Sequence, residues 1–225
     1  MAGSVGFRVR TEWPRPEASL LDSFGEAASP QVADSMSRFG AMDAGIRPVW
    51  RSPRVIGCAL TVWCHAGDNL MIHKAIALAQ PGDILVVNTQ GVVASAPFGE
   101  LLATSALLQG IRAVIVDGCV RDVEALEALQ LPVYSRGICP GGCNKDGGGE
   151  IGTIIACGGV AVRPGDILIA DRDGVTVVPL NDAEEVAQAS IRKMDSERKR
   201  MQEIKAGVIV RPEIDEQLKR LKVIA

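Results

Sequence analysis

The chain has 225 residues, of which 47% are hydrophobic, and it carries a net charge of −3. This length and apolar content predict a single folded domain over residues 1–225 and exclude an intrinsically disordered protein. The slightly acidic charge lacks the basic excess of nucleic-acid-binding proteins, and no apolar run is long enough to cross a bilayer. We therefore expect neither a nucleic-acid nor a membrane partner.

Six cysteines are scattered along the chain. Cys58, Cys64 and Cys157 lie in apolar stretches, which is typical of small buried side chains. Cys139 and Cys143 form a C-x3-C pair without a second pair of ligands, so a structural zinc site is not expected there. A disulfide between them would be unusual in the cytosol. Because the N-terminal residues also lack the pattern of a signal peptide, we expect a cytoplasmic location.

Strand and helix patterns alternate in the middle of the chain, whereas residues 155–178 are rich in strand patterns. The string Pro-Gly-Asp-Ile-Leu occurs at 81–85 and again at 164–168, and each copy predicts a turn that begins a strand. We therefore expect a mixed α/β core with two sheet layers. In chain order, the expected elements are N-terminal helices within 17–40, a strand at 55–64, a helix at 68–79, strands at 84–87 and 113–116, a helix after 122, strands at 167–170 and 175–178, and a C-terminal helical extension at 181–225.

The candidate site combines two short segments. Arg121 and Asp122 lie just past the C-terminal end of an apolar strand pattern at 113–116, and ligands of α/β proteins gather at that end of a strand. A guanidinium beside a carboxylate can hold an anion and a hard cation together. Gly99 begins a helix pattern, so the backbone N–H groups of residues 100–102 are expected to be free to bind a carboxylate. The two segments together would bind a 2-oxo acid on a metal. The simpler interpretation is that Arg121 and Asp122 only cap a helix and form a surface ion pair.

Residues 137–149 are unusually rich in glycine and include Asn144-Lys145-Asp146. The segment is too long and too flexible in composition for a simple connection, so it is a candidate mobile flap.

These motifs, in this order and spacing, resemble a known family. The chain is similar to the class II 4-hydroxy-4-methyl-2-oxoglutarate / 4-carboxy-4-hydroxy-2-oxoadipate aldolases, which share their fold with regulator of ribonuclease activity A. The likeness covers about residues 17–205. The strings that carry it are Gly67-Asp68-Asn69-Leu70, Pro81-Gly82-Asp83, Gly99-Glu100-Leu101-Leu102, Asp117-Gly118-Cys119-Val120-Arg121-Asp122, Pro132-Val133-Tyr134-Ser135-Arg136-Gly137, and Pro164-Gly165-Asp166 followed by Asp171-Arg172-Asp173-Gly174-Val175.

The resemblance implies an architecture and an assembly. The family fold is a three-layer β/β/α swivelling domain of the ribonuclease-regulator-A type. Its members assemble as homotrimers, or as homohexamers built from trimers, with their sites at subunit interfaces. The implied activity is cleavage of a 4-hydroxy-2-oxo dicarboxylic or tricarboxylic acid to pyruvate and a second 2-oxo acid, a lyase reaction of aromatic compound catabolism. Oxaloacetate decarboxylation is the implied side activity.

The resemblance also implies roles for individual residues. Asp122 would hold Mg²⁺ or Mn²⁺, and Arg121 would bind the keto oxygen of the substrate. The substrate carboxylate would lie at Gly99 and Glu100, against the amides of Leu101 and Leu102. Glu100 fills the acidic position of the family's acidic-x20-Arg-Asp signature, where many members carry Asp, and Glu197 from a neighbouring subunit would complete the outer shell. The effect of Glu rather than Asp on the choice of substrate is left open.

Two alternatives remain at this stage. A Schiff-base aldolase would need a desolvated lysine, and Lys145 in the glycine-rich segment is the candidate. A non-catalytic protein that binds a ribonuclease, as in the regulator branch, shares the fold. His65 and His73 are the only histidines of the chain, and both are interpreted as structural.

Overall fold

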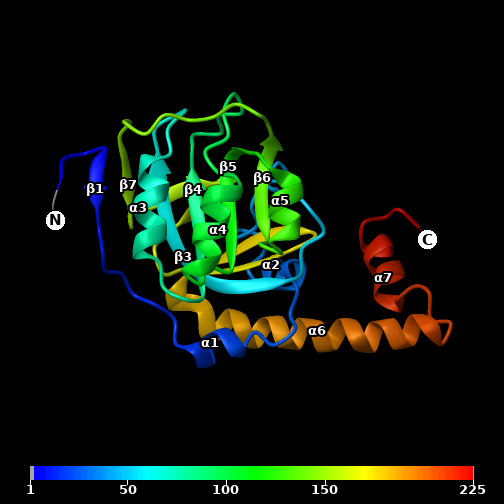
Figure 1. Cartoon of the computed structure of the whole chain (residues 1–225). Coiled ribbons are helices and arrows are strands. Elements are labelled where there is room, and N and C mark those ends of the chain that lie inside the picture. The colour runs from blue at the N-terminus through cyan, green and yellow to red at the C-terminus, as the bar shows by residue number, and fades with distance from the viewer. Residues whose placement is uncertain (1–2, 225) are drawn as a thin grey trace.

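Four parallel strands at the centre of the molecule position the candidate site (Figure 1). The computed structural model describes residues 3–224. Its strands are β1 Phe7–Val9, β2 Arg47–Pro48, β3 Val55–Cys64, β4 Asp83–Asn88, β5 Ala113–Val120, β6 Val133–Ile138, β7 Gly149–Ile151, β8 Ile155–Cys157, β9 Val160–Val162, β10 Ile167–Asp171 and β11 Gly174–Val178. Its α-helices are α1 Ala18–Asp22, α2 Ser29–Ser35, α3 Leu70–Leu78, α4 Glu100–Leu108, α5 Val123–Ala128, α6 Ala183–Lys205 and α7 Pro212–Arg220, and a 3₁₀ turn, Leu180–Asp182, precedes α6.

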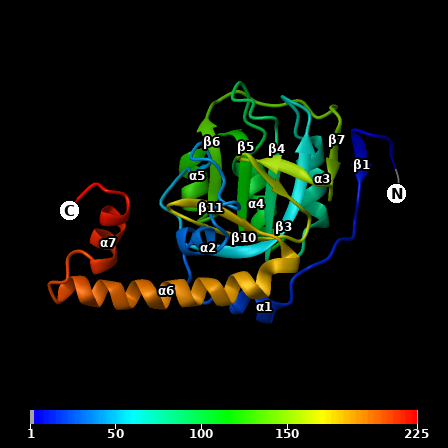
Figure 2. The same ribbon diagram turned by 180° about the vertical axis from the view of Figure 1, so that it is seen from behind.

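The central strands run in the order β3-β4-β5-β6. Along its other edge, β3 pairs antiparallel first with β10 and then with β7, while β1 and β2 complete the two ends of the sheet. All eight residues of β5 are buried, as expected for a parallel strand covered on both faces. Helices α3, α4 and α5 cover one face of this sheet, and the β10–β11 hairpin with β8 and β9 covers the other (Figures 1 and 2).

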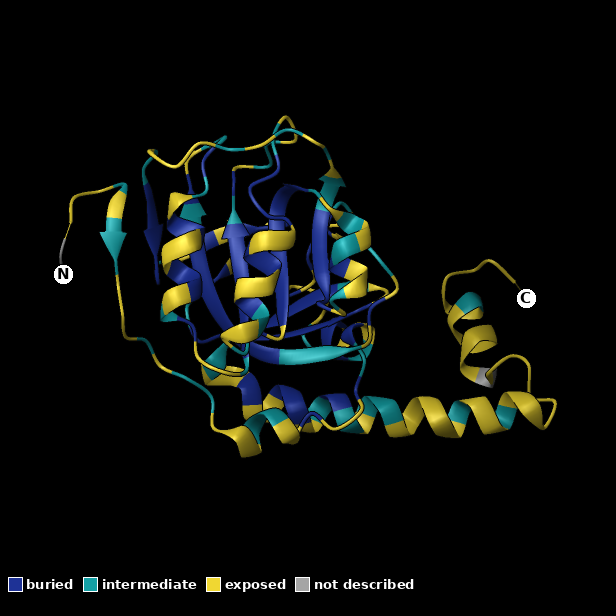
Figure 3. Ribbon diagram, viewed as in Figure 1, coloured by how far each residue is buried: buried dark blue, intermediate teal, exposed yellow. Residues whose placement is uncertain are grey.

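Three apolar clusters match these layers. The largest lies between the sheet and α3–α5, and the second lies between the sheet and the β8–β11 strands. A third cluster packs β10 and β11 against α2 and the first turns of α6. Figure 3 shows the consequence: the central strands are buried, whereas the outer faces of the helices and most of α6 and α7 are exposed. The α/β fold expected from the sequence, two β layers and a helical layer, is confirmed.

The expected elements agree with the structure closely in the middle of the chain and less so near its ends. Strand β3 begins and ends where the apolar run does, and α2 begins at Ser29 with proline in its first turn. Helix α2 ends at Ser35 because Ser37 and Arg38 adopt positive φ, so residues 36–46 are turns and irregular chain rather than helix. Strand β5 extends four residues beyond the predicted Val116. None of the described helices is long and apolar enough to span a bilayer.

Candidate functional site at the end of strand β5

Strand β5 contains an irregularity shortly before the predicted site. Its register with β6 shifts between Val116 and Cys119, so that Asp117 and Gly118 stand opposite the single residue Arg136. This is a β-bulge, and a bulge changes the face toward which the following side chains point. The bulge therefore helps to set the direction of the residues that end β5.

Hydrogen bonds from three segments fix the bulge. The Asp117 carboxylate is bound by the guanidinium of Arg136 and by the N–H of Gly158 at 2.8 Å. The other side of the Arg136 guanidinium binds Asp43 at 3.0 and 3.1 Å. The backbone carbonyl of Asp117 accepts a further hydrogen bond from the Thr89 hydroxyl at 2.7 Å. In this cluster two carboxylates share one guanidinium and the groups hydrogen-bond one another, so we infer that it stabilises the strand end rather than binding a ligand.

Arg121 and Asp122 follow β5 immediately. Asp122 occupies the N-cap position of α5 with a φ of 59°, in the left-handed region that few residues other than glycine adopt. Its side chain makes no capping bond to α5. Instead, Asp122 Oδ2 accepts the N–H of Glu100 at 3.1 Å and lies 3.5 Å from Arg121 Nε. As the simpler interpretation expects, Asp122 stands at the start of α5 and forms an exposed ion pair with Arg121, but its carboxylate binds the start of α4 rather than capping α5.

Gly99 makes this approach possible. A Cβ atom at Gly99 would lie 2.4 Å from Asp122 Oδ2 and 2.9 Å from Arg121 Cγ. The backbone of Gly99 is extended, with φ of −164°, so the requirement is for space rather than for an unusual conformation. Because Asp122 accepts the Glu100 N–H, the expectation that this amide is free for a ligand is wrong. Within residues 3–224, no acceptor pairs with the amides of Leu101 and Leu102, which remain at the N-terminus of α4.

A cavity of about 160 Å³ opens beside the Arg121–Asp122 pair. It brings together the start of α3, the start of α4, the β5–α5 turn and the glycine-rich segment. The lining residues of these four parts are Asn69, His73, Ala96, Pro97, Gly99, Leu101, Leu102, Arg121, Asp122, Gly142, Cys143 and Lys145. Five of the predicted site residues therefore share one cavity: Gly99, Leu101, Leu102, Arg121 and Asp122. Glu100 begins α4 next to them, but it is exposed and is not among the residues that line the cavity.

Sequence reasoning did not place Asn69 and His73 in this site, and it considered Lys145 only as a Schiff-base lysine. Burial, and then the charge of Lys145, lowers the pKa of His73 below its usual range, so its imidazole favours the neutral form. The Oδ1 atom of Asn69 is buried without a hydrogen-bond donor, while its Nδ2 donates to Pro97 at 3.0 Å. Of these residues, only Asn69 belongs to a motif singled out in the sequence, Gly67-Asp68-Asn69-Leu70, and that motif alone does not indicate what Asn69 does.

The segment predicted as a mobile flap is anchored to the start of α3. The N–H of Asn144 donates to the Gly67 carbonyl at 2.8 Å. The carboxylate of Asp68 accepts the N–H groups of Asp146 and Gly147 at 2.9 and 2.8 Å. Burial alone would raise the pKa of Asp68, but its backbone hydrogen bonds outweigh burial and hold the pKa below its usual range. The segment therefore forms a wall of the cavity in this structure, and its mobility stays a prediction.

The residues present fit a hard divalent cation bound by few protein atoms. Asp122 Oδ1 has no partner within the described chain, and carboxylate oxygens are the ligands that Mg²⁺ and Mn²⁺ prefer. No group of three His, Cys, Asp or Glu side chains able to hold a metal is found in residues 3–224. A single carboxylate suits Mg²⁺, which usually keeps several waters and binds substrate oxygens as well.

Glu197 is not near this cavity within one chain. It lies on α6, where its carboxylate accepts a hydrogen bond from Gln31 at 2.8 Å and lies 3.5 Å from Lys193 Nζ. Helix α6 runs past the end of the sheet at which the parallel strands begin, whereas the cavity is at the end where they finish (Figure 1). Any contribution of Glu197 to this site must therefore come from another copy of the chain.

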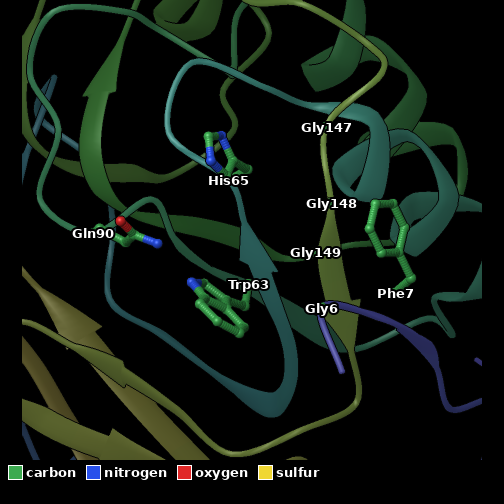
Figure 4. A pocket seen from close by; sticks show the side chains of 8 residues that line it. All are labelled: Gly6, Phe7, Trp63, His65, Gln90, Gly147, Gly148 and Gly149. Carbon is green, nitrogen blue, oxygen red and sulfur yellow. The ribbon is translucent and has the colours of Figure 1, made fainter. Parts of the chain in front are cut away.

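A second cavity of about 320 Å³ lies on the other flank of the Arg121–Asp122 pair, bounded by Ile138, Cys139 and Pro140. A third, of about 370 Å³, lies between the N-terminal strand and the ends of β3 and β4. Figure 4 shows the side chains around this third cavity, with Phe7 and Trp63 on its walls and His65 as its single ionisable group. An anionic substrate would find little charge there, so we assign the site to the cavity beside Arg121.

Comparisons with known proteins agree with this geometry. Residues 29–177 match the family model described as RraA-like, Aldolase/RraA. A Halalkalibacterium halodurans protein named "Putative 4-hydroxy-4-methyl-2-oxoglutarate aldolase" is 34% identical over 193 residues, covering 86% of this chain and 92% of that protein. Streptomyces coelicolor RraAS2, titled an unusual member of the RNase ES inhibitor RraA family, is 25% identical with a TM-score of 0.74, covering 84% of this chain and all of that chain. An uncharacterised Pseudomonas syringae protein shares the fold with a TM-score of 0.78 at 23% identity, covering 87% of this chain and 92% of that chain.

Proposed function

Because this chain belongs to the RraA-like Aldolase/RraA family, we propose that it is a divalent-metal-dependent pyruvate aldolase that cleaves a 4-hydroxy-2-oxo dicarboxylic or tricarboxylic acid. The observation that carries the proposal is the open Arg121–Asp122 pair beside two unpaired helix amides in one cavity. Substrates of this class include 4-hydroxy-4-methyl-2-oxoglutarate and 4-carboxy-4-hydroxy-2-oxoadipate. The metal-dependent branch is favoured because the acidic-x20-Arg-Asp set is complete at Glu100, Arg121 and Asp122.

The two helix amides, Arg121 and Asp122 each have a task in this reaction. The amides of Leu101 and Leu102 bind the C1 carboxylate, as a helix N-terminus binds anions. The Arg121 guanidinium donates hydrogen bonds to the C2 keto oxygen. Asp122 Oδ1 would hold Mg²⁺ or Mn²⁺, which when bound supplies Lewis-acid polarisation of that keto oxygen. These groups together fix the substrate by its 2-oxo acid end.

Cleavage begins with removal of the proton from the C4 hydroxyl. The O–H electrons form the new carbonyl at C4, the C3–C4 bond breaks, and its electron pair enters the C2–C3 unit as a pyruvate enolate. Arg121 stabilises the negative charge that develops on the C2 oxygen, and removing such a contact typically costs about 3 kcal/mol of transition-state stabilisation. Protonation of C3 then gives pyruvate. Oxaloacetate that loses CO₂ forms the same enolate, so decarboxylation follows as a side activity.

The proton acceptor is proposed to be a water oriented by Glu100 and by Glu197 of a neighbouring subunit. The cavity on the far flank of Arg121–Asp122 has space for a side chain from such a neighbouring subunit. Closed homotrimers, or hexamers built from them, would place each site between two chains. A mixture of Glu197→Ala and Arg121→Ala chains should therefore regain activity, since some interfaces combine both intact residues. If proven subunit exchange restores no activity, Glu197 does not belong to a shared site.

The direct test of the proposed function is pyruvate release from the two hydroxy oxo acids, with and without a chelator. We expect excess chelator to abolish cleavage and Mg²⁺ or Mn²⁺ to restore it. The variant Asp122→Ala should need a much higher metal concentration for half-maximal rate. Full activity in excess chelator, or covalent trapping of substrate on a lysine by borohydride, would overturn the metal-dependent assignment.

A protein-binding role is the second candidate, because RraAS2 of Streptomyces coelicolor is titled a member of a ribonuclease inhibitor family. Fold similarity alone does not fix function. This candidate predicts that no 2-oxo acid is cleaved under any metal condition and that the chain inhibits an RNase E-type ribonuclease. The cleavage assay and the ribonuclease-inhibition assay can both be carried out with the same purified protein.

A further inference from the structure

Two cysteine thiols lie in contact where strands β5 and β6 end. Cys119 is buried in β5, opposite Gly137 of β6. A Cβ atom at Gly137 would lie 3.2 Å from Cys119 Sγ, so the missing side chain leaves room for this sulfur beside β6. Burial, and then the Cys139 thiol that hydrogen-bonds with it, raise the pKa of Cys119. The contact therefore links β5 to the residue that directly follows β6.

The backbone holds Cys139 next to β5. Its N–H donates to the carbonyl of Val120 at 3.1 Å, which extends the parallel pairing of β5 and β6 by one residue. Side chains alternate along a strand, so Cys139 lies on the side of the sheet from which Gly137 faces Cys119. Because both backbones are fixed with the sulfurs already in contact, a disulfide between Cys119 and Cys139 needs only a small backbone movement.

The two thiols differ in their access to solvent. Cys119 is 3% exposed, whereas Cys139 is partly exposed and lines the cavity of about 320 Å³ on the far flank of Arg121 and Asp122. A small hydroperoxide can enter a cavity of this size and reach Cys139 Sγ. A reachable thiol beside a second, resolving thiol is the arrangement found in redox-sensing cysteine pairs. Cys119 is in position to be the resolving thiol.

The segment that begins at Cys139 lies against Arg121. A Cβ atom at Gly142 would be 3.2 Å from Arg121 Nη1, so backbone rather than a side chain borders the guanidinium here. The carbonyl of Gly141 accepts the N–H of Ala96 at 2.8 Å, which ties the same segment to the chain before α4. A movement of Cys139 toward β5 would therefore shift the backbone against which the Arg121 guanidinium lies.

We propose that Cys119 and Cys139 form a reversible disulfide in response to hydroperoxides, and that this disulfide lowers turnover at the Arg121 site. Formation of the disulfide is independent of the proposed function, whereas its effect on aldol cleavage rests on that function. Cys139 is then a regulatory residue and takes no part in the cleavage itself.

The oxidation proceeds in two balanced steps. The sulfur of Cys139 attacks the O–O bond of hydrogen peroxide, which leaves Cys139 as a sulfenic acid and releases one water. The sulfur of Cys119 then displaces the sulfenic oxygen, so that the S–S bond forms and a second water is released. Two thiols have lost two hydrogens, and the peroxide has been reduced to two waters. A dithiol reductant reverses the change by thiol–disulfide exchange and is itself oxidised.

Peptide mapping of the full-length protein tests the disulfide without an activity assay. Trypsin places Cys119 in the peptide 113–121, and it places both Cys139 and Cys143 in the peptide 137–145. After hydrogen peroxide and blocking of the remaining thiols, we expect the two peptides to be joined in the wild type and in Cys143→Ser. They should separate after dithiothreitol and should stay separate in Cys139→Ser. A disulfide within 137–145, a cross-link that is lost in Cys143→Ser, or no disulfide at all would overturn the proposed pair.

The effect on the site is measured as the rate of pyruvate release after peroxide, relative to the rate of the same protein in dithiothreitol. We expect oxidation to lower the wild-type rate by roughly 10- to 100-fold, because displacement near a reacting group by about 1 Å commonly has this effect. Dithiothreitol should restore the rate. Cys143→Ser should lose and regain activity as the wild type does, whereas Cys139→Ser should keep its rate after peroxide.

A wild type that forms the disulfide with unchanged turnover would overturn the regulatory role, as would an equal loss of activity in Cys139→Ser. A loss that dithiothreitol does not restore would also overturn it, because it would report irreversible oxidation. If the reduced wild type cleaves no 4-hydroxy-2-oxo acid but the peptides still become joined, the proposed function and the effect on cleavage fail while the disulfide stands. The two failures are therefore distinguishable.

Discussion

Two arginine–aspartate pairs lie near the same end of strand β5, and their environments differ sharply. In the Asp117–Arg136 pair, the carboxylate is buried and both of its oxygens accept hydrogen bonds, while Arg136 binds Asp43 as well. In the Arg121–Asp122 pair, the side chains are 42% and 40% exposed and their nearest charged atoms are 3.5 Å apart. The Asp117–Arg136 pair is hydrogen-bonded to other groups of the chain through both of its side chains. The Arg121–Asp122 pair leaves donors and acceptors open to solvent.

The difference predicts separate roles for two pairs made of the same residue types, one in stability and one in the proposed chemistry. The buried, hydrogen-bonded Asp117–Arg136 pair holds the bulge in β5 in place, and the last residues of β5 follow that bulge. An open pair, with Asp122 held in a left-handed conformation, keeps its remaining donors and acceptors for a ligand. Substitutions at the first pair should therefore act on folding, and substitutions at the second on turnover.

The largest expected effect on stability is that of Asp117→Ala. Removing this carboxylate leaves the N–H of Gly158 and part of the Arg136 guanidinium without their partner in a buried region. We expect the free energy of unfolding to fall by about 3 kcal/mol, as measured by urea denaturation. A loss of less than about 1 kcal/mol would show that the Asp117–Arg136 pair behaves like an exposed ion pair. It would then not differ in stability from the Arg121–Asp122 pair.

Gly99→Ala should give an intermediate effect, and on activity rather than on folding. The added Cβ would lie 2.4 Å from Asp122 Oδ2 and would push the carboxylate away from the start of α4. We expect kcat/KM for aldol cleavage to fall roughly 10- to 100-fold, as displacement of a reacting group by about 1 Å commonly does. Ser105→Ala, an exposed change on the same helix, is the matched control. Wild-type activity in Gly99→Ala would mean that the position of Asp122 is not critical.

The smallest expected effect is on acid stability. The hydrogen bond from Arg136 holds the pKa of Asp43 below its usual value of 3.8. A carboxyl group whose pKa is lower in the folded state contributes stability above that usual value and loses it as the pH falls through the folded pKa. Asp43→Asn should therefore flatten the loss of unfolding free energy on acidification below pH 3.8. An unchanged slope would show that the hydrogen bond from Arg136 does not lower the pKa of Asp43.

The sequence was sufficient for most central elements and for five residues that line the candidate cavity, because both depend on local signals. The apolar run of 55–64 and the turns at Pro-Gly-Asp are local patterns, and they place β3, β4 and β10 correctly. Arg121 and Asp122 could be located because a strand pattern ends directly before them.

Other features depend on contacts between distant segments, so the sequence could not supply them. The bond from the Glu100 amide to Asp122 requires the left-handed φ of Asp122, which no local pattern of this chain signals. The placement of Lys145 beside His73 depends on how Asp68 anchors a segment almost eighty residues away in sequence. Register shifts such as the bulge in β5 likewise depend on the partner strand.

The most direct test of the account is the turnover number of Arg121→Ala with 4-hydroxy-4-methyl-2-oxoglutarate and Mg²⁺, measured together with its free energy of unfolding. We predict that kcat falls by roughly 10²- to 10³-fold, because the enolate loses its guanidinium. The free energy of unfolding should change by no more than about 0.5 kcal/mol, because the pair is exposed. A turnover number close to that of the wild type would contradict the account and reduce Arg121–Asp122 to a surface ion pair at a helix start.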